Sequence, residues 1–239
     1  MRSWNDWKEV IITLLIRASG YSAILFVALI FIFLLREGLP ALAEVPLTEL
    51  LSQRWYPIEA YFGLLPLLGG TLIVTLGAAL IATPIGVGTA IYIAEIAPRW
   101  ARELLKPFIE VMAGIPSVVL GFIGVLALAP LLRRLLDLPT GLTALTGSLL
   151  LAAISLPTIV SVAEDALDAV PRAYRDAALA LGATHWQTIW RVTLPAARSG
   201  VLTAVMLGLG RAIGETMTVM MVTGNAPATP TSLGALFSP

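Results

Sequence analysis

The sequence of 239 residues contains no cysteine and a single histidine, His185. Without thiols the chain forms neither disulfides nor thiolate metal sites, and one imidazole is too few for a histidine metal cluster. No G-x-x-x-x-G-K-[ST] segment occurs, and neither Lys8 nor Lys106 follows a glycine, so a phosphate-cradling loop is missing. These absences predict that the chain holds no metal or other cofactor and hydrolyses no ATP itself.

Charge is also scarce. Charged residues make up 13% of the chain and hydrophobic residues 58%, and the mean hydropathy is +0.89. This composition is too apolar for a soluble domain and predicts an all-α integral membrane protein. The formal net charge is zero, so the charge balance gives no reason to expect nucleic acid as a partner, and membrane lipid is the expected surroundings.

Five apolar stretches are long enough to cross a bilayer as helices. Glycines and Pro84 in the second stretch, and Pro157, which we expect to break the fourth, are tolerable where neighbouring helices satisfy the freed backbone groups, which implies a bundle. Ala41-Leu42-Ala43 resembles a signal-peptidase site, but the apolar run before it is longer than a signal core, which favours a retained span. The five predicted spans are residues 18–35, 70–92, 111–132, 138–163 and 199–224.

Two parts are expected along the chain. Residues 1–66 would comprise a cytoplasmic N-terminal segment, the first span and a periplasmic or interfacial segment, and residues 67–239 the core domain. With the N-terminus inside, ten of the 15 Lys and Arg residues lie on the inner side and four on the outer side, while Arg211 lies in the membrane. The positive-inside rule therefore favours a cytoplasmic N-terminus.

Residues 164–198 form a charged, Ala-rich segment between the fourth and fifth spans. Pro171 suits the first turn of a helix, and Gly182 can adopt the left-handed conformation that ends one. Thr184 and Gln187 match a capping box for a second short helix that runs to the Leu194-Pro195 break. The first helix should carry one apolar stripe, formed by Tyr174, Ala177, Ala178 and Leu181.

Part of this segment resembles the EAA loop of bacterial ABC importer permeases. The matching residues are Asp176-Ala177-Ala178, Gly182 and Val192-x-Leu194-Pro195, with Asp176 where the family usually has Glu and Val192 where it usually has Ile. The resemblance implies that these residues dock into a separate ATPase subunit and couple it to the membrane part. A solvated loop between two spans is the plainer alternative.

The fifth span contains two charged residues, Arg211 and Glu215, which are costly in lipid and need a partner or water. Their i, i+4 spacing lets them pair, and Gly210-x-x-x-Gly214 predicts close packing that turns both toward the bundle interior. One interpretation is a buried ion pair that fixes packing. The other is an anion relay, because a guanidinium binds phosphate through two parallel hydrogen bonds and a nearby carboxylate would keep binding weak. Ser117 and Ser161 are candidate path hydroxyls, although such groups also bond helix backbone.

Gly-Arg-Ala-Ile-Gly-Glu-Thr-Met at 210–217 and Ala-Gly-Ile-Pro-Ser-Val-Val at 113–119 resemble the phosphate-specific ABC importer permeases of the C type, as do residues 164–167 and 224–233. The resemblance implies the MetI-like type I importer fold, with one further C-terminal span than is visible here. It also implies a second homologous permease, an ATPase dimer and a periplasmic phosphate-binding protein. A permease for another oxyanion or an amino acid, and a non-transporting scaffold or sensor, remain as alternatives.

Overall fold

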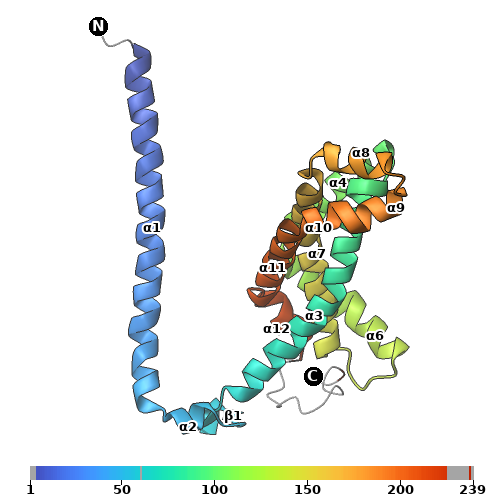
Figure 1. Cartoon of the computed structure of the whole chain (residues 1–239). Helices are drawn as coiled ribbons and strands as arrows, with labels where there is room; N and C mark the ends of the chain where they lie inside the picture. The colour runs from blue at the N-terminus through green and yellow to red at the C-terminus, as the bar shows by residue number, and fades with distance from the viewer. Residues whose placement is uncertain (1–3, 60, 225–236, 238–239) are drawn as a thin grey trace. The chain divides into compact units, whose positions relative to one another are not determined.

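A computed structural model describes residues 4–59, 61–224 and 237 of the chain, and these residues are predominantly helical (Figure 1). They divide after Leu64 into two compact units, each of which is described by itself below. Of the predicted tail motif at 224–233, the residues after Gly224 lie outside the described part of the chain.

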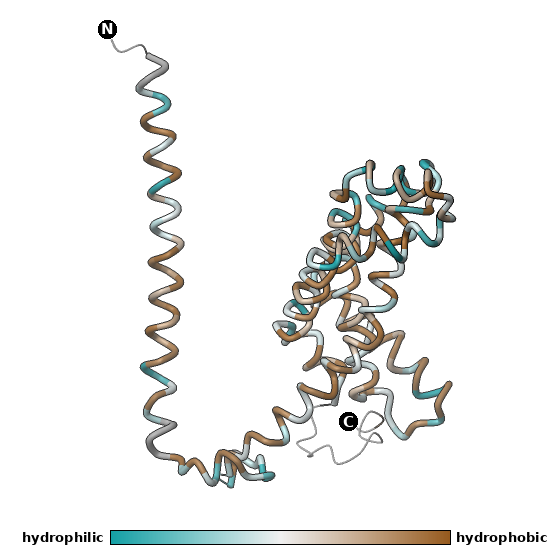
Figure 2. Tube along the Cα trace, viewed as in Figure 1, coloured by the Kyte–Doolittle hydropathy of each residue, from teal (hydrophilic) through white to brown (hydrophobic). Residues whose placement is uncertain are grey.

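The first unit is dominated by a single long helix, α1 (Trp4–Glu44), of which Trp7–Pro40 is apolar enough to cross a membrane. Its described side chains are exposed around the whole helix. Hydrophobic residues predominate along its length (Figure 2), as expected for a helix surrounded by lipid. Short elements follow, namely α2 (Leu47–Leu50), β1 (Trp55–Tyr56), a 3₁₀ turn (Pro57–Glu59) and β2 (Tyr61–Phe62). The two strands pair antiparallel, with Trp55 opposite Phe62.

The second unit is an assembly of helices, several of which contain π-helical turns. In chain order they are α3 (Leu65–Ile91) with η2 (Tyr92–Ile96), α4 (Arg99–Gly114), α5 (Ser117–Ile123), η3 (Gly124–Leu128), α6 (Ala129–Leu135), α7 (Ala144–Asp168), α8 (Arg172–Ala180), α9 (His185–Thr188), η4 (Ile189–Thr193), α10 (Leu194–Ala196), α11 (Arg198–Ile213) and α12 (Met217–Val222).

Helix α7 forms the centre of this unit, with α3 and α11 packed on it. Both neighbours present small residues at every fourth position, which allows their backbones to approach α7 closely. Ile159 of α7 lies between them, because a Cβ added at either Gly86 or Gly208 would overlap its side chain. The buried small stripes are Ala78, Ala82, Gly86 and Ala90 on α3, and Ala204, Gly208 and Ala212 on α11.

Four described helices are long and apolar enough to span a membrane, or five if the bent pair His185–Ala196 and Arg198–Ile213 is one span. The second and fourth predicted spans correspond to α3 and α7, but α7 begins only at Ala144. The prediction that Pro157 breaks the fourth span is wrong, since α7 continues through it as one helix. Packing on both sides holds the helix together there despite the missing N–H.

The boundaries of the third and fifth spans were also predicted wrongly. The third begins at Ser117 rather than residue 111, because Pro116 disfavours helical geometry at Ile115, which is extended (φ −68°, ψ 125°). The fifth is not one helix, since α11 ends at Ile213 and α12 begins at Met217. The break between α11 and α12 contains Gly214 and Glu215 and follows Arg211 by two residues.

Candidate transport path and coupling segment

Arg211, near the end of α11, is exposed on the surface of this chain. Its guanidinium donates two long hydrogen bonds, one to Thr158 Oγ1 of α7 at 3.3 Å and one to the Ala113 carbonyl near the end of α4 at 3.4 Å. Both acceptors are neutral, and no carboxylate of the described residues pairs with the guanidinium. The guanidinium therefore keeps N–H donors for an external acceptor.

Glu215 does not pair with Arg211, and the predicted ion pair is wrong. The i, i+4 argument requires a continuous helix, whereas α11 stops two residues after Arg211 and Glu215 lies in the turn. Its Oε1 instead accepts hydrogen bonds from the backbone N–H of Thr218 at 3.1 Å and from Thr218 Oγ1 at 3.0 Å. The carboxylate therefore satisfies donors at the start of α12 rather than competing for the guanidinium.

The expected packing surface was assigned to the wrong glycines. A Cβ at Gly210 would meet nothing within 4 Å, and one at Gly214 would meet only carbonyls of the preceding turn, while Gly208 lies against Ile159 and the Ser155 carbonyl. This register places Ala204, Gly208 and Ala212 against α7 and leaves Arg211 on the exposed side. The expectation that Arg211 faces the interior of this chain's own bundle is therefore wrong.

The two candidate serines lie on helices that adjoin this region. Ser161 is exposed on α7, one helical turn beyond Thr158, and Ser117 is half-buried at the start of α5. Within the described part of the chain, neither hydroxyl makes a hydrogen bond. The Ser117 carbonyl accepts from Thr218 Oγ1 at 2.9 Å, which ties α12 to α5 and brings the two helix breaks together.

The helix pair at 172–196 has the local structure that the sequence predicts for its turn. Gly182 has φ +84°, and the N–H groups of Gly182 and Ala183 bond the carbonyls of Leu179 and Ala178, which is a Schellman cap. The capping box between Thr184 and Gln187 is present in both directions. Pro171 is the N-cap of α8 rather than its first residue.

The second helix differs from the expected one. The chain stays helical through Leu194 and Pro195 to Ala196 and then bends by 72° into α11, so the predicted break at Leu194-Pro195 is displaced by one residue. Pro195 fits because it occupies the first turn of α10, where its missing N–H costs little.

The expected apolar stripe on α8 is mostly exposed. Ala178 is buried, whereas Tyr174 is 55% exposed and Leu181 90% exposed, and Asp176 and Ala177 are exposed beside them. Leu194 is half-buried against the core and Pro195 is exposed. The α8 surface therefore presents alanines, an aromatic ring and a carboxylate that the described residues leave uncovered.

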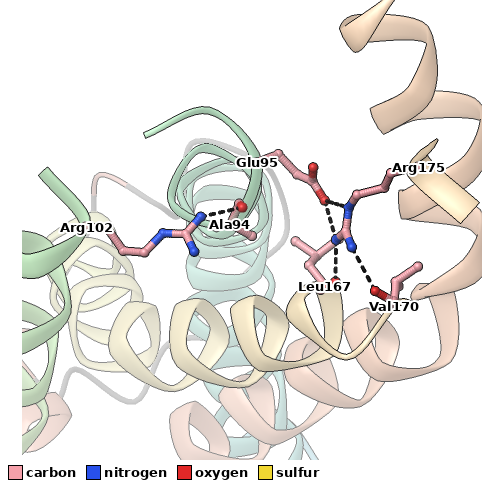
Figure 3. Close-up of polar contacts among 6 residues, drawn as sticks. All are labelled: Ala94, Glu95, Arg102, Leu167, Val170 and Arg175. Atoms are coloured by element: carbon pink, nitrogen blue, oxygen red, sulfur yellow. Dashed lines mark hydrogen bonds and ion pairs between the residues drawn. The ribbon is translucent and has the colours of Figure 1, made fainter. Parts of the chain in front are cut away.

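Behind this surface, Arg175 of α8 connects three elements (Figure 3). Its Nε and Nη2 donate to Glu95 Oε1 of η2 at 3.0 and 2.6 Å. Its Nη1 donates to the Val170 carbonyl at 2.7 Å, and Nη2 also reaches the Leu167 carbonyl of α7 at 2.8 Å. The side chains are 18% and 5% exposed for Arg175 and Glu95, so this ion pair is largely shielded from water.

Lys106 of α4 makes the second ion pair, with Nζ 2.8 Å from Oε1 of Glu164 on α7. The close contact with the Glu164 carboxylate raises the pKa of Lys106 above its usual range, with smaller contributions from Asp168 and Asp165, despite the opposing effect of partial burial. Arg102 of α4 also donates to the Ala94 carbonyl at the end of the α3 span (Figure 3). Helix α4 is therefore tied to α3 and to α7.

A pocket of about 500 Å³ lies beside these contacts. Basic and acidic groups line it in nearly equal number, so it has no strong preference for one sign of charge. The charged lining residues are Arg102, Arg172, Arg175, Glu95, Asp168 and Asp176, together with His185.

Sequence reasoning missed the roles of Glu95, Lys106, Glu164 and Arg175. Arg175 and Glu95 are 80 residues apart in the sequence, and a single sequence does not show that two such residues lie close together in space. The sequence did contain one signal. Glu95 and Glu164 each lie at or just beyond the end of an apolar span, and charges at such positions need partners.

These features define a polytopic helical membrane protein with a charged helix pair between two spans. The chain belongs to the family of binding-protein-dependent transport system inner membrane components, whose model matches residues 82–238. The predicted all-α permease fold class and the resemblance to importer permeases are thereby confirmed, and members of this family are transport subunits rather than enzymes in themselves.

Among known proteins, the chain is similar to the probable ABC transporter permease protein YqgH of Bacillus subtilis, with 44% identity over 189 residues. It is also similar to the phosphate transport system permease protein PstC of Mesorhizobium japonicum, with 35% identity over 238 residues, and to PstC of Pasteurella multocida, with 38% over 204 residues. These matches cover 78%, 92% and 77% of this chain and 61%, 73% and 63% of the respective relatives.

Proposed function

We propose that this chain is a membrane permease subunit of an ATP-driven phosphate importer. The observation that carries the proposal is Arg211, a guanidinium in the membrane part whose two hydrogen bonds are long and go to neutral acceptors. Such a group can bind an oxyanion through parallel N–H donors. The names of the PstC relatives support phosphate as that oxyanion.

The exposed position of Arg211 suits a path shared between two chains. A second homologous permease would cover this face, so that each subunit forms half of the path. Thr158 holds the guanidinium, while Ser117 and Ser161 have free hydroxyls that can donate to a passing anion. Glu215 acts indirectly, by fixing the turn between α11 and α12 through Thr218.

The coupling segment around Asp176, Ala177, Ala178, Gly182, Leu194 and Pro195 would dock into an ATPase dimer carried on separate chains. The small alanines allow a partner to approach the α8 backbone, and the Schellman cap fixes the turn beside it. This assignment requires α8 and the N-terminus in the cytoplasm, and a periplasmic phosphate-binding protein would deliver the ion to the opposite side.

Uptake of labelled phosphate into vesicles that contain the assembled complex tests the proposal. Arg211→Ala should lower uptake by about 10- to 100-fold, the factor expected for losing a charge-assisted hydrogen-bond donor, while the complex still assembles. Arg134→Ala, an exposed arginine on α6, should leave uptake unchanged. Normal uptake by the Arg211→Ala complex would contradict the anion role.

The same vesicles separate the alternative functions. Competition by sulfate, molybdate or amino acids, with phosphate ineffective, would reassign the cargo. A wild-type chain that co-purifies with the ATPase but never stimulates its hydrolysis would instead be a scaffold or sensor.

A further inference from the structure

The connection made by Arg175 has no counterpart elsewhere among the described residues of the second unit. One guanidinium bonds a carboxylate at the end of the α3 span, the Leu167 carbonyl in the last turn of α7 and the Val170 carbonyl just beyond it (Figure 3). Its own backbone belongs to α8. Nε, Nη1 and Nη2 all take part, so the group is held in one orientation.

We propose that Arg175 is the positioning residue that makes α8 move as one body with the ends of α3 and α7. This inference rests on the proposed coupling role of α8, and it names the contact through which that role reaches the membrane part. Glu95 is the acceptor on the α3 side, and the carbonyls of Leu167 and Val170 are the acceptors on the α7 side.

The surrounding contacts explain why such a link transmits movement rather than merely filling space. Helices α3 and α7 already pack along their length through the small-residue stripe, so fixing α8 to both ends makes the three elements one unit. Lys106 and Arg102 attach α4 to the same two ends. A push on α8 therefore displaces the start of α4, and α4 leads directly to the Ala113 carbonyl that contacts Arg211.

The chemistry of the link requires arginine. A lysine at position 175 would keep the positive charge and could pair with Glu95. One ammonium lacks the rigid planar set of N–H donors with which a guanidinium bonds the carboxylate and two separate carbonyls at once. Arg175→Lys thus removes the rigidity while retaining the ion pair, which is the distinction that a test needs. Arg99→Lys is the matched control, because Arg99 is an exposed arginine of α4 that makes no bond with other described residues.

The first measurement uses the full chain alone in lipid nanodiscs. Because the sequence has no cysteine, Ala173→Cys on α8 and Leu80→Cys on α3 allow two spin labels to be placed uniquely, both at exposed positions. The distance distribution between the labels should be narrow in the parent and in Arg99→Lys, and clearly broadened in Arg175→Lys. An equally narrow distribution in Arg175→Lys would overturn the link.

The second measurement is the number of phosphate ions imported per ATP hydrolysed by the assembled complex. This ratio does not depend on how much complex folds, so a general loss of stability leaves it unchanged. Arg175→Lys should lower it by about fivefold or more, in the range of typical coupling between sites, while Arg99→Lys keeps the parental ratio.

A broadened distribution with an unchanged ratio would overturn the positioning role. If the wild-type complex imports no phosphate at all, the proposed cargo fails. The spin-label measurement still decides the link in that case, because it needs neither cargo nor partner.

Discussion

At the scale of single residues, the pair of Lys106 and Glu164 is a clear case of unequal burial. The Glu164 side chain is 5% exposed and Lys106 41%, so removing the lysine leaves a nearly buried carboxylate without its cation. Lys106→Met should destabilise the protein by about 1–2 kcal/mol, below the value for fully buried pairs because water screens the lysine. Lys106→Met combined with Glu164→Gln should recover part of that loss in thermal unfolding followed in detergent.

The pH dependence of the same pair follows from the raised pKa of Lys106. A base whose pKa is raised by folding stabilises the folded state fully below its unfolded value of 10.5, and the contribution disappears as the pH rises through the folded-state value. The difference between wild type and Lys106→Met should therefore be constant between pH 6 and about pH 9 and shrink above roughly pH 10.5. A difference that shrank already near pH 7 would contradict this account.

Gly182 permits another prediction at this scale, because its φ of +84° is accessible to few other residues. Gly182→Val should cost about 2 kcal/mol or more, since a left-handed conformation strains any Cβ and a β-branched one most. Gly182→Asn should keep most of the function, because asparagine tolerates this region. ATPase co-purification measures the effect on docking, and wild-type association of Gly182→Val would contradict the coupling assignment.

At the scale of elements, the α7–α11 contact depends on which glycine faces α7. Gly208→Ala places a methyl group on Ile159 and should destabilise by about 1–3 kcal/mol, as overpacking does. Gly210→Ala meets open space and should leave stability unchanged or raise it, since alanine favours a helix over glycine by up to about 1 kcal/mol. Melting temperatures of the two variants in the same detergent decide the register, and a reversed order would refute it.

How far the sequence predicts this structure depends on the range of the interaction concerned. The Gly182 cap and the Thr184–Gln187 box were predictable, because both involve residues within one turn. The Arg211–Glu215 pair was not, because a break at Gly214 removes the helical spacing on which the prediction relied. The existence of the spans could be predicted from hydropathy. The partners of Arg175 and Lys106 could not, because predicting them requires knowing which helix ends meet.

At the scale of the whole chain, α7 separates two exposed regions. The coupling proposal depends on which side of the membrane each of them faces. The helix has 25 residues and is therefore about 37 Å long, enough to cross the hydrocarbon core, so the end of α6 and the cap of α8 should lie on opposite sides of the membrane. The proposed orientation places α8 with the N-terminal segment on the cytoplasmic side. The coupling segment can meet an ATPase only in that case.

Single-cysteine labelling can establish this orientation, because the parent chain offers no background thiol. In intact cells an impermeant maleimide should label Leu135→Cys, at an exposed position on α6, and should fail to label Leu181→Cys and Glu9→Cys. All three should react once the membrane is opened, which controls for accessibility. Labelling of Leu181→Cys from outside would place α8 beyond the reach of any cytoplasmic ATPase, and the coupling role would fail with it even if phosphate uptake were normal.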